Sequence, residues 1–106
     1  MKVLLSLIII FVLSSCSQLS DEEIFVQIMD DEWSRLTTNN PVYASSMGIL
    51  DRNQEWSDYS VSAELEDNEH NVTVLNKLIT LDYKSFSNLN NTNYALFVKE
   101  YENDIE

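Results

Sequence analysis

The chain has 106 residues, which leaves room for at most one domain. Its 18 acidic and 6 basic side chains give a formal net charge of -12. Nucleic acids and anionic membranes attract Lys and Arg, so this charge argues against both as electrostatic partners. A solvated acidic surface accounts for the charge without a special function.

The first residues have the order of an export signal. Lys2 gives a positive start, and the apolar run over residues 3–13 is interrupted only by Ser6. The run is eleven residues long, whereas a membrane-spanning helix needs about 20. Residues 1–15 therefore predict a signal peptide rather than a transmembrane anchor.

A cysteine follows the apolar run directly. Leu13, Ser14, Ser15 and Cys16 resemble the lipobox of bacterial lipoproteins. The resemblance implies that the sulfur of Cys16 receives a diacylglyceryl group and that Cys16 becomes the lipidated N-terminus after cleavage. Residues 16–19 are then the lipidated cysteine and its tether. The alternatives are an ordinary secretory signal with a chance cysteine and a short buried hairpin helix.

The same segment predicts where in the cell the protein is located. Ser17 stands where many lipoproteins of the inner membrane carry Asp, so we expect an outer-membrane lipoprotein that faces the periplasm in a cell with two membranes. Cys16 is the only cysteine, so no intramolecular disulfide can form.

A helix is predicted from Ser20 to about residue 39. Ser20 and Glu23 have the spacing of a capping box. Arg35 can pair with Asp31 one turn earlier. The apolar residues at helical spacing are Phe25, Ile28, Met29, Trp33 and Leu36.

Glu32 projects onto this apolar stripe. One interpretation is an acid that faces a polar interior cavity. The other, which we prefer, is an acid at the edge of the stripe or paired with a basic group.

A short helix and a loop are predicted next. Asn40 can cap the helix with its side chain, Pro41 suits its first position, and Gly48 can adopt the left-handed turn that ends it. The alternative for residues 39–48 is an irregular loop. In the loop over residues 49–59 we expect three apolar side chains to pin the chain to the domain rather than line a ligand groove: Leu50, Trp56 and Tyr59.

A long helix is predicted from about residue 60 to 83. Its expected inner face carries Val61, Leu65, Val72, Leu75, Ile79 and, beyond the helix, Phe86. His70 then lies opposite, on a solvated face among acidic residues. A lone histidine there is neither a catalytic nor a metal site, because zinc needs three or four converging ligands.

The last helix is predicted to start near Asn90 or Asn91, with Leu96 on its outer side. Its inner face carries Tyr94, Phe97, Val98, Tyr101 and Ile105. No alternating stretch predicts a strand, so the expected fold class is all-α, with three to four helices. The last helical pattern has no closing signal, so we expect residues 20–106 to be the N-terminal part of a larger helical domain.

From Asn40 and Pro41 onward, the sequence resembles the bacterial family catalogued as domain of unknown function eight-eight-five. The family pattern has Asn-Pro, then Ala and Ser, then Gly, an Asp-containing loop, a long helix and a helix with an early Tyr. The matching residues are Asn40, Pro41, Ala44, Ser45, Gly48, Asp51, Trp56, Asp58, Leu89 and Tyr94.

The resemblance implies a part of a helical zinc metallopeptidase. Family members carry a His-Glu motif and a later Pro-Gly-His element, and nothing here corresponds to either, since Asn71 follows His70. We therefore assign no catalytic, cofactor-binding or metal residue, and zinc is expected only in the full-length family.

Two functions remain open from the sequence. The first is a lipid-anchored N-terminal fragment of a peptidase-like lipoprotein, whose partners are the membrane and the missing C-terminal part of the same domain. The second is a complete small acidic helical lipoprotein that acts as a binding module.

Overall fold

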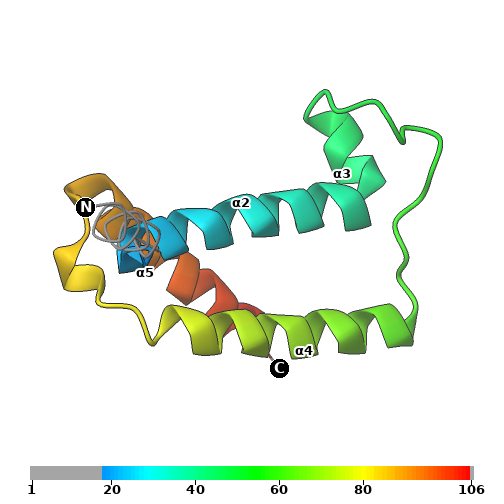
Figure 1. The fold of residues 1–106 in the computed structure, drawn as a ribbon. Coiled ribbons are helices and arrows are strands. Elements are labelled where there is room, and N and C mark those ends of the chain that lie inside the picture. The colour runs from blue at the N-terminus through cyan, green and yellow to red at the C-terminus, as the bar shows by residue number, and fades with distance from the viewer. Residues whose placement is uncertain (1–17, 106) are drawn as a thin grey trace, which may run out of the picture.

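The computed structural model describes residues 18–105, and these form an all-helical fold, as the sequence predicts. α2 (Asp21–Asn39) and α4 (Val61–Leu78) lie side by side, and α3 (Pro41–Ser46) follows the end of α2 (Figure 1). α5 (Asn88–Asp104) runs obliquely from the start of α2 toward α4 (Figure 1). A 3₁₀ turn, η2 (Tyr83–Ser85), precedes α5.

The start of α2 is fixed by the predicted capping box. The Ser20 hydroxyl accepts a hydrogen bond from the Glu23 N–H at 3.3 Å, and the Glu23 carboxylate accepts one from the Ser20 N–H at 2.8 Å. Asp21 and Glu22 complete an acidic first turn. Their negative charges stabilise the helix, because the N-terminus is the positive end of the helix dipole.

An aromatic cluster forms the core. Phe25 is fully buried, and its ring centroid lies 5.5 Å from that of Phe86, 5.6 Å from that of Tyr94 and 6.1 Å from that of Phe97. The buried residues of this cluster are Phe25, Val74, Leu78, Leu81, Phe86 and Tyr94. They come from the start of α2, the end of α4, the connection between α4 and α5, and the start of α5, so the core gathers at one end of the helices.

The predicted orientation of α4 is wrong. The helix ends at Leu78, and Val74 and Leu78 face the core. Of the predicted stripe, only Phe86, beyond the helix, is buried as expected. Both sets of apolar residues recur in steps of three and four, and the aromatic cluster selects the second. The chain turns after Leu78, which brings Leu81 and Phe86 into the core.

α5 begins two residues earlier than predicted. Ser87 caps it by accepting a hydrogen bond from the Asn90 N–H at 3.3 Å. The predicted inner face is confirmed for Tyr94, which is buried, and Leu96 is exposed as expected. Phe97, Val98 and Tyr101 pack against the core.

α3 ends as predicted, because Gly48 has a φ of +85°. Asn40 precedes α3 but makes no side-chain cap hydrogen bond, so that detail is wrong. The predicted anchors of the following loop are also wrong, since Leu50 is 59% exposed, Trp56 83% and Tyr59 81%.

Polar contacts hold this loop instead. The Arg52 guanidinium donates to the Glu55 carboxylate at 3.0 Å through Nε and to the Thr38 carbonyl at 2.6 Å through Nη1. The loop is therefore tied to the end of α2 by one cation, and its aromatic side chains stay exposed.

Replacing Phe25 with Ala tests the aromatic cluster. We expect the free energy of unfolding to fall by about 3–5 kcal/mol, because the change removes a fully buried ring and leaves a cavity. Urea denaturation followed by circular dichroism measures it. The neighbouring Val26→Ala variant is the control, since Val26 is exposed. Equal losses in both variants would contradict the assigned core.

A second prediction concerns Glu22, which joins α2 to the start of α5. Its carboxylate accepts hydrogen bonds from the Ser87 N–H at 3.1 Å, the Ser87 hydroxyl at 2.7 Å and the Asn90 side chain at 2.7 Å. These hydrogen bonds lower the pKa of Glu22, and the bond from the Ser87 hydroxyl has the largest effect. Its stabilisation is therefore present above about pH 4.3, the ordinary value, and is lost as the pH falls below it.

We expect Glu22→Gln to weaken the loss of stability between neutral and acid pH, measured by urea denaturation at each pH. Glu66→Gln, at an exposed position of α4, is the matched control. An unchanged pH profile in Glu22→Gln would show that the bond to α5 contributes nothing.

Candidate functional site

Glu32 joins three helices. Its Oε2 accepts a hydrogen bond from the hydroxyl of Tyr101 on α5 at 2.6 Å. The Nε2 of His70 on α4 lies 2.9 Å from Oε1 and 3.0 Å from Oε2. The Glu32 side chain is 14% exposed and that of His70 is 30% exposed. One carboxylate thus connects α2, α4 and α5 away from bulk water.

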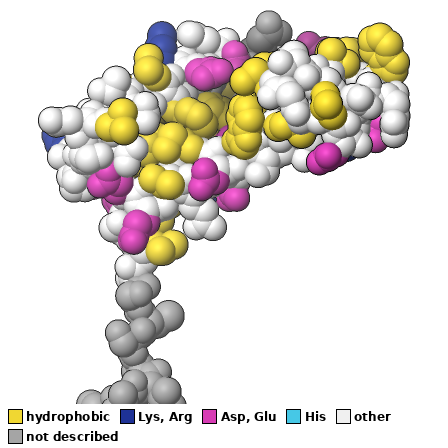
Figure 2. Space-filling model, turned by 90° about the horizontal axis from the view of Figure 1, so that it is seen from above, with side chains coloured by type: hydrophobic (Ala, Val, Ile, Leu, Met, Phe, Trp, Pro, Cys, Tyr) yellow, Lys and Arg dark blue, Asp and Glu magenta, His cyan; other side chains and the backbone are white. Residues whose placement is uncertain are grey.

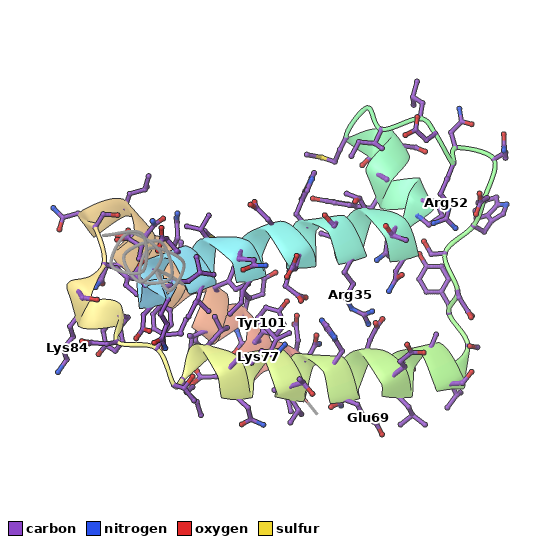
Figure 3. The ribbon with its side chains drawn as sticks, in the orientation of Figure 1. Arg35, Arg52, Glu69, Lys77, Lys84 and Tyr101 are labelled. Atoms are coloured by element: carbon purple, nitrogen blue, oxygen red, sulfur yellow. The ribbon has the colours of Figure 1, made fainter. Side chains whose placement is uncertain are left out.

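An ion pair lies one turn further along α2. Arg35 extends from α2 toward α4 (Figure 3), where it hydrogen-bonds Asp67. The sequence predicted Asp31 as its partner, and this is wrong because Arg35 faces the neighbouring helix, whose carboxylate it reaches.

These groups line a cleft of about 390 Å³ between α2, α4 and α5. Its apolar wall includes Trp33 and Leu36 of the predicted α2 stripe, which are 45% and 40% exposed. The lining residues are Met29, Glu32, Trp33, Arg35, Leu36, Asn39, Asn40, Asp67, Asn71, Phe97, Glu100, Tyr101 and Asp104. Four of these are acids and one is an arginine, so the cleft is acidic.

Burial is the largest cause that raises the pKa of Tyr101 far above its ordinary range. The hydrogen bond to Glu32 and the charges of Glu32 and Glu100 act in the same direction. The phenol therefore stays protonated and serves as a hydrogen-bond donor, rather than as an acid or base near neutral pH.

The sequence anticipated Glu32 only in part. The structure combines both interpretations, since Glu32 pairs with a basic side chain, His70, and also lines the cleft. The predicted solvated position of His70 is wrong, because α4 presents its other face to the domain. A signal was present: Asp67, His70, Val74 and Leu78 recur in steps of three and four, as one inner face requires.

The geometry ties three helices together through one carboxylate. Both oxygens of Glu32 are engaged by neighbouring side chains, so the carboxylate has a fixed position. Within residues 18–105, no three His, Cys, Asp or Glu side chains form a group that could hold a metal ion. The zinc implied by the family resemblance therefore has no ligand set in this part of the chain.

Cys16, the predicted lipidation site, lies outside the described residues. None of the helices in the described part combines the length and apolar content that crossing a membrane requires. Comparisons of the chain with protein-family models, curated proteins and solved structures find no match. The family resemblance thus remains an expectation.

The Tyr101 hydroxyl predicts a stability change at alkaline pH. Because its pKa is raised in the folded state, its stabilisation is present below about pH 10, the ordinary value, and is lost as the pH rises above it. We expect Tyr101→Phe to be less stable at neutral pH and to lose less further stability above pH ~10. Tyr59→Phe, at an 81% exposed loop position, is the matched control.

Urea denaturation at several pH values measures both variants. Identical alkaline profiles for Tyr101→Phe and the original chain would contradict the buried bond to Glu32.

Proposed function

We propose that this chain is the lipid-anchored N-terminal helical part of a peptidase-like bacterial lipoprotein, a structural part without an active site of its own. The observation that carries the proposal is the outer side of α4, where Val61 is 72% exposed, Leu65 62% and Ile79 61%. These side chains lie along one side of the helix, and large exposed apolar surfaces on soluble proteins mark sites that another structure covers. Further helices of the same protein would cover this one.

The order of residues at the start of the chain supports the anchor. Lys2, the apolar run and Cys16 stand in the order that lipoprotein signals use. α2 begins at Asp21, five residues after Cys16. An extended segment of that length spans at most about 18 Å, so the lipid would hold the helical body close to the membrane. The acidic surface adds no attraction to anionic lipids, so attachment depends on the acyl chains.

The cleft supports a structural role. Glu32, His70 and Tyr101 use their polar atoms on one another and hold α2, α4 and α5 in register. Peptidase chemistry, which the family resemblance implies for the whole protein, would then belong to a further part that carries the His-Glu and Pro-Gly-His elements and their zinc.

The anchor is tested by replacing Cys16. The full chain, made in a bacterium fed an alkyne analogue of palmitate, should carry the label and sediment with the outer membrane. Cys16→Ser should lose the label and leave the membrane fraction, because the thiol that accepts the lipid is gone. Ser15→Ala, next to the cysteine, is the control and should keep the label. Labelled Cys16→Ser protein would contradict the lipobox.

The coding DNA beyond Glu106 tests the rest of the proposal. We expect a continuing reading frame with a His-Glu motif and a later Pro-Gly-His element. A stop codon directly after Glu106 would overturn the proposal and would leave the small acidic binding module as the function.

A further inference from the structure

The outer face of α4 carries a regular packing pattern that the domain does not use. Its residues are Val61, Leu65, Val72, Leu75 and Ile79, here called the α4 seam, with Asn68 at the remaining position. The successive steps are four, three, four, three and four residues, the spacing with which one helix packs along another. The α4 seam adjoins the core side of α4 at Leu75, which is partly buried, and the rest of it turns away from Val74 and Leu78, which face the core.

Most of the α4 seam is open to solvent. Val61, Leu65 and Ile79 are more than half exposed, Val72 is 39% exposed, and Leu75 is partly buried. The seam runs the length of α4, from its first residue to its C-cap, Ile79. It therefore offers an apolar stripe five turns long, since each turn takes about 3.6 residues.

Acidic side chains border the α4 seam on both sides. Glu64 precedes Leu65, Glu69 follows Asn68, and both acids are exposed. Figure 3 shows Glu69 on the side of α4 that points away from α2. No basic residue directly flanks the α4 seam, since Lys77, the one lysine of α4, lies one heptad after His70 and so on the opposite side of the helix.

A second copy of the chain does not fit this stripe. In a parallel pair, Glu64 of one copy would oppose Glu69 of the other, because flanking positions five residues apart meet across such a seam. In the antiparallel pair whose apolar layers match over the whole helix, Glu69 of one copy would face Glu69 of the other. The net charge of -12 adds a general repulsion between copies.

We propose that the α4 seam binds an amphipathic helix whose apolar stripe is flanked by Lys or Arg. The apolar residues of that helix fit between Leu65, Val72 and Ile79, while its basic residues lie against Glu64 and Glu69. This inference rests on the proposed function, in which the helix belongs to a further part of the same lipoprotein. Figure 2 views the molecule from above Figure 1, on the side away from the α4 seam, and there too apolar side chains lie among Asp and Glu.

Synthetic helices test the proposal on the full lipidated chain held on phosphatidylcholine vesicles. Two fluorescent peptides share one Leu stripe, flanked by Lys in the first and by Glu in the second. A third keeps the Lys content but has its Leu positions scrambled. Fluorescence anisotropy gives each Kd. We expect the first peptide to bind at least about tenfold more tightly than either of the others.

A pair of neutral substitutions separates the α4 seam from general attraction to an acidic protein. Leu65→Asn with Ile79→Asn leaves the net charge unchanged and should weaken the first peptide by at least about tenfold. The matched control is Leu89→Asn with Leu96→Asn, at α5 positions that are 72% and 66% exposed. It should bind like the original chain, and circular dichroism checks that both variants fold.

Several results would overturn the proposal. The first two are equal binding of the three peptides and unchanged peptide binding by the seam variant. The third is a dimer, seen by analytical ultracentrifugation, that the Leu65→Asn change abolishes. The fourth is binding of Cys16→Ser protein to vesicles that the Leu65→Asn change abolishes. The last would assign the α4 seam to lipid. A stop codon after Glu106 with intact peptide binding would overturn only the proposed function, whereas a continuing reading frame without peptide binding would overturn only this inference.

Discussion

The burial of Phe25 is the contact on which the described fold depends. Isolated helices of this length are marginal in water, so α2, α4 and α5 need tertiary packing to persist. The Phe25 ring supplies it, because it meets Phe86, Tyr94 and Phe97 at the point where these segments converge. The Tyr94 hydroxyl, buried in the same cluster, donates to the Leu78 carbonyl at 3.0 Å and so joins α5 to the end of α4.

Beyond the aromatic cluster, polar contacts replace apolar packing between α2 and α4. Glu32 and Arg35 of α2 reach His70 and Asp67 of α4. Partly buried polar pairs add little net stability, because removing charges from water offsets much of their attraction. These pairs do favour one relative position of α2 and α4, since any other position breaks a pair and leaves a charge without its partner. The cleft is therefore held in register by directional contacts, while the aromatic end provides most of the stabilisation.

The sequence determined the start of α2 and the end of α3 better than the orientation of α4. The Ser20–Glu23 capping box and the Gly48 turn depend on a few neighbouring residues, so they could be read locally. The rotation of α4 could not, because two of its faces have helical apolar spacing. Which face turns inward depends on Phe25 and Tyr94, distant in sequence, and tertiary packing overrides a local pattern.

The remaining differences follow from the rotation of α4. With Val74 inward, His70 comes within reach of Glu32 and Asp67 within reach of Arg35. The loop anchors have another cause. Trp56 and Tyr59 have the composition of buried anchors, but the polar contacts of Arg52 already fix the loop. Composition alone does not say whether a loop is held by buried aromatic side chains or by polar contacts.

The rotation of α4 also explains how an exposed apolar stripe and a strongly acidic surface fit together. An uncovered stripe of this length invites association between copies. Glu64 and Glu69 at its borders oppose that association in the in-register parallel pair, and they favour a helix of opposite charge. Because most of the α4 seam is exposed, such a helix could bind without moving Phe25 or the Glu32 contacts. The acidic composition, which argues against a nucleic-acid partner, would then select among the helices that could cover α4.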